Sequence, residues 1–324
     1  MSEDRLKVHL LHPPDEPYAT QFRRALDRTI RLTDGSEVPA DCRVLIAGVP
    51  DRDQLEALPD LEALIIPWAG LPAKTRRLAQ DFANLTVYNI HHNAPAAAEH
   101  AVGLLLAAAR NLIPIDWALH RNDWRPRYTD AEALLLEGHR AIVLGYGAIG
   151  RRIARALEAI GMAVHAVKRT AGEMLDRGVH LHAKEDLPDL LSEAVALMVA
   201  LPLTSETEGL IGSRELSLLP GSSVIVNVAR GAIIDERALY EELNSGRLRA
   251  GLDVWYEYPA DKQSRANTPP SQYDFGSLPN VVMTPHLAGH TVDTERLRLR
   301  ELARLLNRLA RGDQLTPIDI QRGY

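Results

Sequence analysis

The stretch Ala141–Gly150, AIVLGYGAIG, decides the fold of this chain. An apolar run leads directly into three glycines, and the helix-period stretch RRIARALEAIG follows. This order predicts a strand, a tight turn and a helix. The first glycine permits the turn, the second lets the backbone approach a pyrophosphate, and the third lets the helix pack on the strand. Free amides at the helix N-terminus attract the phosphate. We predict a dinucleotide-binding turn, with a plain strand–helix turn as the alternative, and assign cofactor binding to Gly145, Tyr146, Gly147, Ala148, Ile149 and Gly150.

Length and charge limit the organisation and the partners of the chain. A chain of 324 residues exceeds the size at which one hydrophobic core stops growing, so two domains are expected. The net charge of -6 argues against a nucleic-acid binder, which would carry a basic surplus. The arginines of residues 294–312 alternate with Glu and Leu at helical spacing, which is typical of a solvated helix face. We expect no nucleic-acid partner.

Cysteine content and hydropathy bear on the compartment. Cys42 is the only cysteine, so no internal disulfide can form and a reducing compartment is favoured. The first residues, MSEDRLKVHLLHPP, carry acidic side chains where a signal peptide carries positive ones. The longest apolar run, Ala101–Ala109, is too short to span a bilayer. We expect a cytoplasmic protein without a membrane partner.

Over residues 1–90, short apolar segments alternate with helical ones. FRRALDRTI, residues 22–30, has helical spacing, whereas ALIIPWAG, residues 63–70, reads as a strand followed by a turn. This alternation predicts a parallel sheet covered by helices. Ligands bind beyond the carboxyl ends of such strands, so Trp68 either contacts a ligand or caps the core of its loop.

A long apolar helix is predicted in NAPAAAEHAVGLLLAAARNL, residues 93–112. Because it is apolar on nearly all sides, we expect it to be buried between two bodies and to connect the domains. His91, His92 and His100 have no carboxylate or cysteine at ligand spacing, so no metal site is predicted. From Ala141 the strand–helix alternation resumes and predicts a doubly wound sheet of six or seven strands. The fold class is therefore α/β, with two doubly wound parallel sheets.

The residues after the second strand of this sheet bear on the choice of dinucleotide. A site for a plain ribose usually has an acid there, but AVHAVKRT places Lys168, Arg169 and Thr170 at this position. Two cations and a hydroxyl suit a 2′-phosphate, so NADP(H) is preferred and NAD(H) remains possible. The alternative is a surface Lys-Arg pair without a ligand.

Three further strand ends each carry one unusual polar residue: Arg230, Asp253 and His286. A guanidinium presents a fork that matches a carboxylate in two hydrogen bonds. A histidine gives and takes a proton near neutral pH. Together with a hydride-carrying nicotinamide, these groups suffice to reduce a carbonyl that lies beside a carboxylate.

Six stretches in fixed order resemble the D-isomer-specific 2-hydroxyacid dehydrogenases, whose relatives include glyoxylate/hydroxypyruvate reductases, phosphoglycerate dehydrogenase and formate dehydrogenase. They are NAPAAAEHAVGLLLAAAR, VLGYGAIG, LPLTSETEGLIG, NVARGAIIDERAL, AGLDVW and NVVMTPHLAG. The resemblance covers the chain from about residue 60 onward; before that, only the order of predicted elements matches.

The resemblance implies roles for individual residues. Arg230 is implied as the catalytic arginine and His286 as the general acid/base. Trp68 predicts a bulky wall and small substrates. Substrate contacts are implied for the backbone of Ala69, Gly70 and Leu71, with Asn93 nearby. The residues implied to line the cofactor cleft are Leu201, Pro202, Thr207, Val228, Ala229, Asp253 and Gly289.

The resemblance also implies how the chain is divided. A Rossmann cofactor domain, residues 96–289, is inserted in a flavodoxin-like substrate domain made of residues 1–95 and 290–324. Two copies of the chain are implied to form a homodimer through the cofactor domain.

One departure from the family pattern concerns the proton donor. The family usually has a Glu immediately before the proline of DVFxxEP, where it pairs with the histidine. Here the stretch is DVWYEYP, so Tyr258 fills that position and Glu257 stands one residue early. In an extended segment such a shift points the side chain to the other face. Either Tyr258 hydrogen-bonds His286, or an irregular backbone lets Glu257 reach it. The stretch after Pro259 is longer than usual, so a remodelled rim is expected.

The function that follows is reduction of small 2-keto acids to D-2-hydroxy acids, with Arg230, His286 and Tyr258 as catalytic residues. A dehydrogenase of another small anion, such as formate, is one alternative. The other is a sensor that binds the cofactor without turnover, because the usual Glu position holds Tyr258. Retention of both Arg230 and His286 favours the enzyme.

Overall fold

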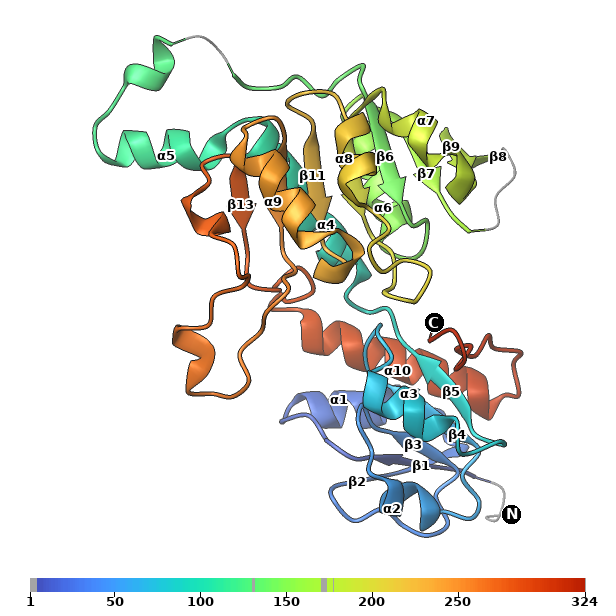
Figure 1. Ribbon diagram of the computed structural model, residues 1–324. Coiled ribbons are helices and arrows are strands. Elements are labelled where there is room, and N and C mark those ends of the chain that lie inside the picture. The colour runs from blue at the N-terminus through green and yellow to red at the C-terminus, as the bar shows by residue number, and fades with distance from the viewer. Residues whose placement is uncertain (1–4, 130–131, 170–173, 177, 324) are drawn as a thin grey trace. The chain divides into compact units, whose positions relative to one another are not determined.

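The computed structural model describes residues 5–129, 132–169, 174–176 and 178–323, and the chain forms two compact units (Figure 1). Unit 1 joins Met1–Asn93 to His290–Tyr324, and unit 2 is Ala94–Gly289. Each unit has one mostly parallel sheet with helices on both faces. The predicted α/β class with two doubly wound sheets is confirmed.

The sheet of unit 1 has five parallel strands in the order β2-β1-β3-β4-β5. The elements of this unit are β1 (Leu6–Leu10), α1 (Tyr18–Ala25), β2 (Ile30–Asp34), β3 (Val44–Ile46), α2 (Arg52–Glu56), β4 (Ala63–Ile66), α3 (Ala73–Ala79), β5 (Thr86–Asn89) and α10 (Thr294–Ala310). Phe22 of α1 and Leu302 of α10 pack on one face of the sheet, and Leu55 of α2 and Leu78 of α3 pack on the other. Helix α10 therefore completes the core of a sheet formed by the N-terminal part of the chain.

The prediction of one helix over residues 22–30 is wrong. Helix α1 ends at Ala25, and Ile30 begins β2, which lies at the edge of the sheet. Between them Asp27 turns the chain, because its carboxylate accepts hydrogen bonds from the backbone N–H and the hydroxyl of Thr29. This local turn ends the helix although the apolar spacing continues.

The sheet of unit 2 has eight strands in the order β13-β12-β11-β10-β6-β7-β9-β8. Its strands are β6 (Arg140–Leu144), β7 (Ala163–Val167), β8 (Met174–Asp176), β9 (Val179–His182), β10 (Ala194–Val199), β11 (Val224–Asn227), β12 (Arg249–Leu252) and β13 (Val281–Met283). Its helices are α4 (Ala94–Ala109), α5 (Leu112–His120), α6 (Gly150–Ala159), α7 (Leu187–Leu191), α8 (Ser213–Leu218) and α9 (Glu236–Asn244), with short 3-10 turns at η1 (Arg125–Arg127), η2 (Lys184–Asp186), η3 (Gly231–Ile233), η4 (Ser264–Ala266) and η5 (Phe275–Ser277). The predicted six or seven strands omitted β8, a short edge strand that pairs antiparallel with β9.

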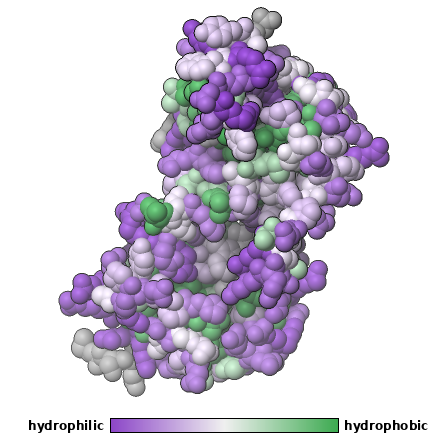
Figure 2. Space-filling view, turned by 90° about the vertical axis from the view of Figure 1, so that its left-hand side faces the viewer, coloured by the Kyte–Doolittle hydropathy of each residue, from purple (hydrophilic) through white to green (hydrophobic). Residues whose placement is uncertain are grey.

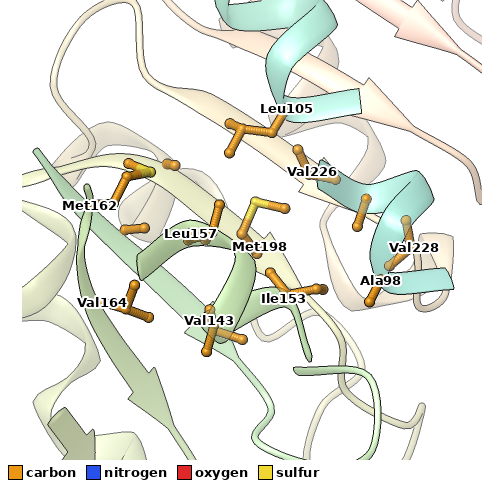
Figure 3. Close-up of a cluster of buried hydrophobic side chains, with 14 of the residues drawn as sticks. Ala98, Leu105, Val143, Ile153, Leu157, Met162, Val164, Met198, Val226 and Val228 are labelled. Carbon is orange, nitrogen blue, oxygen red and sulfur yellow. The ribbon is translucent and has the colours of Figure 1, made fainter. Parts of the chain in front are cut away.

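Two apolar layers hold the sheet of unit 2. Figure 3 shows part of the layer between the sheet and helices α4 and α6, where Leu105, Ile153 and Leu157 meet Val143 and Met198. The opposite face is covered by apolar side chains of α7, α8 and α9, among them Leu191, Leu216 and Leu239. Tight packing on both faces fixes the strands whose ends carry the predicted site residues.

Helix α4, predicted to lie buried between two bodies, is buried on one side and partly exposed on the other. It packs against β11, β12, β13 and α6 of its own unit. On its outer side, however, Leu106 is 36% exposed, and α5 adds exposed apolar side chains at Leu112, Ile113, Ile115, Trp117 and Leu119. Figure 2 faces the side of the molecule that carries α5 and shows green apolar surface among purple polar surface.

Among the described residues, no single helix is long and apolar enough to cross a membrane. Helices α4 and α5 meet the criteria of length and composition only as a pair, and the pair is bent by 67°.

Candidate active site

The carboxyl ends of five neighbouring strands place predicted site residues along one edge of the unit 2 sheet. Strands β13, β12, β11, β10 and β6 are parallel and consecutive. The loops that follow them contain His286, Asp253, Arg230, Pro202 and Gly145, respectively. The structure thus places the predicted catalytic and cofactor-binding residues at the same edge of the sheet as the glycine turn.

The glycine turn has the space that a dinucleotide pyrophosphate needs. Gly145 has φ +103°, and a Cβ there would lie 2.6 Å from the backbone O of Ala200. A Cβ on Gly150 would lie 1.8 Å from the O of Gly145, so only glycine lets α6 approach the strand end. A Cβ on Gly147 would meet nothing within 4 Å, and this open space leaves room for phosphate oxygens.

Tyr146 supports this turn from the core. Its side chain is 9% exposed, and its hydroxyl donates to Oδ2 of Asp176 at 3.1 Å. The guanidinium of Arg151 lies 5.3 Å from the ring centre, and its Nε donates to the Tyr146 backbone O. Burial, and then Asp176, raise the pKa of the phenol. The partner Asp176, on β8, was not predicted from the sequence.

Lys168 and Arg169 follow β7, as the sequence indicates, while Thr170 lies outside the described residues. Lys168 is half-buried and its backbone N–H donates to the O of His182. This hydrogen bond ties the predicted cation site to the end of the neighbouring strand β9.

Three imidazoles stack on these two strands. The ring centre of His165 lies 5.0 Å from that of His180 and 5.0 Å from that of His182. Nδ1 of His165 and Nε2 of His182 are 2.8 Å apart, so one of them donates a hydrogen bond to the other. Burial, and then the charge of Arg140, lower the pKa of His165 to about 4.

This low pKa predicts a loss of stability in mild acid. The unfolded chain binds the proton at its ordinary pKa of 6.5, whereas the folded chain binds it only near 4. The neutral His165 side chain therefore costs no stability above pH 6.5. The free energy of unfolding falls as the pH decreases from 6.5 toward 4, because only the unfolded chain readily binds the proton. Between pH 7 and pH 5 the loss of unfolding free energy is below about 2 kcal/mol, because the partly exposed ring is screened by solvent. We expect His165→Phe, which keeps a stacked ring, to reduce the difference between urea midpoints at the two pH values. His139→Phe, at an exposed position, is the control, and an equal reduction there would contradict the assignment.

Asn227 shapes the loop that carries Arg230. It is 2% exposed at the end of β11. Its Oδ1 accepts from the N–H of Ala229, and its Nδ2 donates to the backbone O of Arg230. The exposed guanidinium of Arg230 donates from Nη1 to the O of Ala229 at 2.6 Å. Val228 and Ala229 are buried, so the loop is rigid and only the Arg230 side chain reaches outward.

The loop after β10 is closed by Thr207. Its hydroxyl donates to the O of Pro202 at 2.7 Å and accepts from the N–H of Thr204 at 2.8 Å. Leu201 is half-buried and Pro202 exposed at its start. The hydroxyl of Thr207 therefore shapes this side of the predicted cofactor cleft through its own loop.

Asp253 is fully buried and holds the turn that contains His286. Its carboxylate accepts from the hydroxyl of Thr284 at 2.6 Å and from the N–H groups of Leu287 and Ala288 at 2.8 and 2.9 Å. Nε2 of His100, on α4, lies 3.0 Å from the Thr284 hydroxyl. Because the single hydroxyl proton is directed to Asp253, His100 donates to Thr284. Sequence reasoning missed this role of His100, since nothing local links it to residues so far along the chain.

His286 adopts a left-handed backbone conformation with φ +58°, which costs about 1–2 kcal/mol for a residue other than glycine. The two N–H groups bound to Asp253 immediately follow it, so the buried carboxylate stabilises this conformation. The ring centre of Tyr258 lies 5.6 Å from that of His286. The Tyr258 hydroxyl accepts from the backbone N–H of Trp255 at 3.1 Å. Glu257 is exposed, and its N–H donates to the O of Pro270.

The long stretch after Pro259 is fastened to α9. Both oxygens of Glu236 accept hydrogen bonds from this stretch, one from Ser271 at 2.6 Å and one from Gln272 at 3.0 Å. Phe275 is 1% exposed and packs edge-on against Trp255. The stretch is therefore an ordered part of the unit, fixed by a glutamate that was not singled out from the sequence.

In unit 1 the predicted substrate loop follows β4. Ala69, Gly70 and Leu71 are half-buried, and Nδ2 of Asn89, at the end of β5, donates to the backbone O of Ala69. Trp68 is 41% exposed. Oδ1 of Asn93 is buried and finds no hydrogen-bond partner among the described residues.

Within the described part of the chain, no group of three or more His, Cys, Asp or Glu side chains is arranged to hold a metal ion. This includes the stacked histidines of β7 and β9.

The comparisons with known proteins agree with this geometry. The family model "D-isomer specific 2-hydroxyacid dehydrogenase, NAD binding domain" matches residues 102–288. The chain is similar to a glycerate dehydrogenase of Methylorubrum extorquens, 32% identical over 254 residues that make up 75% of this chain and 74% of that protein. It is also similar to a hydroxypyruvate reductase of Thermotoga maritima, 35% identical over 206 residues, 63% of each chain.

A solved structure has the same fold over almost the whole chain. It is a D-isomer specific 2-hydroxyacid dehydrogenase from Xanthobacter autotrophicus in complex with NADPH and MES, with a TM-score of 0.80, 24% identity, and coverage of 99% of this chain and 100% of that one. The matched segment, the relatives and the strand-end loops together show that this chain is an NAD(P)-dependent oxidoreductase that belongs to the D-isomer-specific 2-hydroxyacid dehydrogenase family.

Proposed function

We propose that the protein reduces short 2-keto acids to D-2-hydroxy acids and prefers NADPH. The observation that carries the proposal is the meeting of Arg230, His286 and the glycine turn at one edge of the unit 2 sheet. We assign cofactor binding to unit 2 and substrate binding to the loop Trp68–Leu71 of unit 1. Relatives named glycerate dehydrogenase and hydroxypyruvate reductase support this substrate class.

In the proposed mechanism each group of the chain has one task. The guanidinium of Arg230 binds the substrate carboxylate and keto oxygen and polarises the carbonyl. The N–H groups of Ala69, Gly70 and Leu71 hold the carboxylate. A bound nicotinamide supplies the hydride. The imidazole of His286 gives its proton to the keto oxygen as negative charge develops there. Asp253 keeps His286 in position through the turn.

Tyr258 and Asn93 complete the proposed site. The ring of Tyr258 flanks His286, so it orients the imidazole by contact. The buried, unpartnered Oδ1 of Asn93 is available to accept a hydrogen bond from a bound substrate.

The cofactor proposal assigns Lys168, Arg169 and Thr170 to a 2′-phosphate, with NAD(H) as a weaker ligand. The other residues assigned to the cofactor are those of the glycine turn, Gly145–Gly150, together with Leu201, Pro202, Thr207, Val228, Ala229, Asp253 and Gly289. A structural neighbour from Sinorhizobium meliloti, an NADPH-dependent glyoxylate/hydroxypyruvate reductase in complex with NADP and sulfate, has a TM-score of 0.78 and 21% identity.

We expect the double variant Lys168→Ala, Arg169→Ala to raise the KM for NADPH by about 10²–10⁴-fold, because charged hydrogen bonds contribute roughly 1.5–3 kcal/mol each and the variant removes two. The KM for NADH should change by less than about threefold, since NADH has no 2′-phosphate. Steady-state kinetics with both cofactors measures the change. Lys74→Ala, an exposed lysine of unit 1, is the control. Equal losses with NADPH and NADH would contradict the assignment.

The proposed activity is tested by following oxidation of NADPH and NADH with glyoxylate, hydroxypyruvate, pyruvate and larger 2-keto acids. Turnover of a short acid, faster with NADPH, is the expected result. Oxidation with none of them rejects the proposal. NADPH binding without any turnover points to a sensor protein, and reduction of cofactor by formate points to a formate dehydrogenase.

We also propose that two copies of the chain pair through α5 and the outer side of α4. Five of the nine residues of α5 are large apolar side chains that are exposed, and contiguous exposed apolar surface marks interaction sites. Asp116 is the only acidic residue in this helix, so two identical faces can meet with little repulsion. We also propose a cytoplasmic location. The chain has one cysteine, Cys42, which is a buried free thiol, and a chain without an internal disulfide suits a reducing compartment.

We expect Trp117→Glu combined with Ile113→Asp to produce a monomer, because each change places a charge in a face that pairing would bury. Sedimentation equilibrium should give twice the chain mass for the wild type and the chain mass for this variant. Val292→Glu, at a position 96% exposed in unit 1, should leave the mass unchanged. A monomeric wild type would contradict the proposal.

A further inference from the structure

Gly48 and Trp68 form a contact that the catalytic chemistry does not require. Gly48 follows β3 and Trp68 follows β4, and these neighbouring strands run parallel in register, with Ile46 opposite Ile65. Both residues therefore lie at the carboxyl edge of the unit 1 sheet, where ligands bind in sheets of this kind.

The indole of Trp68 lies against the α-carbon of Gly48. A Cβ on Gly48 would come within 1.8 Å of Cη2, 2.2 Å of Cζ2 and 2.8 Å of Cζ3 of the indole. The φ angle of Gly48 is not in the left-handed region, so its backbone is open to any residue. Glycine at position 48 thus makes room for the six-membered ring of Trp68 and is not needed for the turn itself.

Both sides of this contact are fixed. The hydroxyl of Thr75, which is fully buried on α3, donates to the O of Gly48 at 2.7 Å. On the other side, Asn89 donates to the O of Ala69, the residue after the indole. These hydrogen bonds fix the backbone on both sides of the contact, and 41% of Trp68 stays exposed. The indole thus packs on Gly48 and remains partly exposed to solvent.

We propose that Trp68, seated on Gly48, is the residue that limits the size of the substrate side chain. This rests on the proposed function, in which the amides of Ala69, Gly70 and Leu71 hold the carboxylate. A keto acid held there by its carboxylate has its C2 substituent close to the preceding residue. In this proposal the indole closes one side of the substrate site, which accepts hydrogen, methyl or hydroxymethyl at C2 and excludes branched or aromatic groups. The substrate class is therefore that of glyoxylate, pyruvate and hydroxypyruvate.

The test compares kcat/KM for 2-ketoisocaproate with kcat/KM for glyoxylate, using NADPH. Trp68→Ala should raise this ratio by about 10–100-fold, since a few methylenes in an apolar pocket discriminate on this scale. Trp68→Phe, which keeps a ring over Gly48, should stay within a few-fold of the wild type. An unchanged ratio in Trp68→Ala, with glyoxylate still reduced, would reject the size limit and leave the proposed function intact.

A double-mutant cycle tests whether Gly48 acts through its contact with the Trp68 indole. Gly48→Ala should lower kcat/KM for glyoxylate in the presence of Trp68, because the added methyl displaces the ring, but should have no effect in a Trp68→Ala background. Equal effects in both backgrounds would show that Gly48 acts through something other than the indole and would overturn the proposal. A wild type that reduces none of the acids overturns both the size limit and the proposed function. Thermal unfolding of each variant verifies that it is folded.

Discussion

His286→Asn is expected to lower kcat for reduction of glyoxylate by about 10²–10⁴-fold, the usual contribution of a positioned general acid. Asparagine is the appropriate replacement, because His286 has φ +58° and asparagine tolerates the left-handed region better than most residues. The hydrogen bonds from Leu287 and Ala288 to Asp253 should then persist, so the loss reports the missing proton and not a collapsed turn. Stopped-flow measurement of NADPH oxidation gives kcat, and fluorescence titration should show unchanged NADPH binding.

Two companion variants separate the contributions around the histidine. Tyr258→Phe keeps the ring that flanks His286 and should retain most of the activity, because the Tyr258 hydroxyl bonds to the Trp255 backbone. Glu257→Gln should leave the pH dependence of kcat unchanged, since this side chain is exposed. A shifted pH profile in Glu257→Gln would mean that the loop brings the carboxylate to the imidazole. A kcat within threefold of the wild type in His286→Asn would mean that another group donates the proton.

Arg230→Lys is expected to lower kcat/KM by about 10²–10³-fold, because lysine keeps the charge but loses one of two parallel charged hydrogen bonds to the substrate and much of the polarisation of the carbonyl. The backbone of Arg230 is held by Asn227, so the substitution changes the head group and not the loop. Initial rates over a range of hydroxypyruvate concentrations should show both a raised KM and a lowered kcat.

The matched control is Arg237→Lys on α9, where the arginine is exposed and pairs with Glu241. It should leave kcat/KM unchanged. If Arg230→Lys raised only the KM for NADPH, Arg230 would belong to the cofactor site and the assignment to the substrate would be wrong.

The sequence is informative about this fold wherever one local pattern determines an element. The apolar run and the glycines of residues 141–150 predict β6, the turn and α6, and these elements are present. Prediction fails for the start of β2, which the sequence places in a helix. The turn at Asp27 ends the helix although the apolar residues keep helical spacing up to Ile30. The predicted burial of α4 also fails on its outer side, where Leu106 is 36% exposed. An apolar sequence alone does not show which side of a helix the rest of the chain covers.

The site divides in the same way. Arg230, Asp253 and His286 stand out because each is a polar residue at the end of an apolar strand. Two supporting contacts are not visible in the sequence, because they join residues far apart in the chain: His100 bonds Thr284, and Glu236 bonds Ser271. Asn227 acts locally, on Ala229 and Arg230, but no sequence pattern marks it as a support. Gly48 is similar, because the space it provides is defined by a ring on the next strand.

The packing of α10 on the sheet of unit 1 affects how the chain folds during its synthesis. The strands of unit 1 leave the ribosome before unit 2, but one face of their sheet is covered by Leu299, Leu302 and Leu306, which are synthesised after all of unit 2. Domains generally fold as units during synthesis. Unit 2 therefore has its complete sequence before the older sheet does, and that sheet exposes apolar surface throughout this interval. The order of completion is the reverse of the order of synthesis, which makes the N-terminal sheet the segment that most needs protection from aggregation while translation continues.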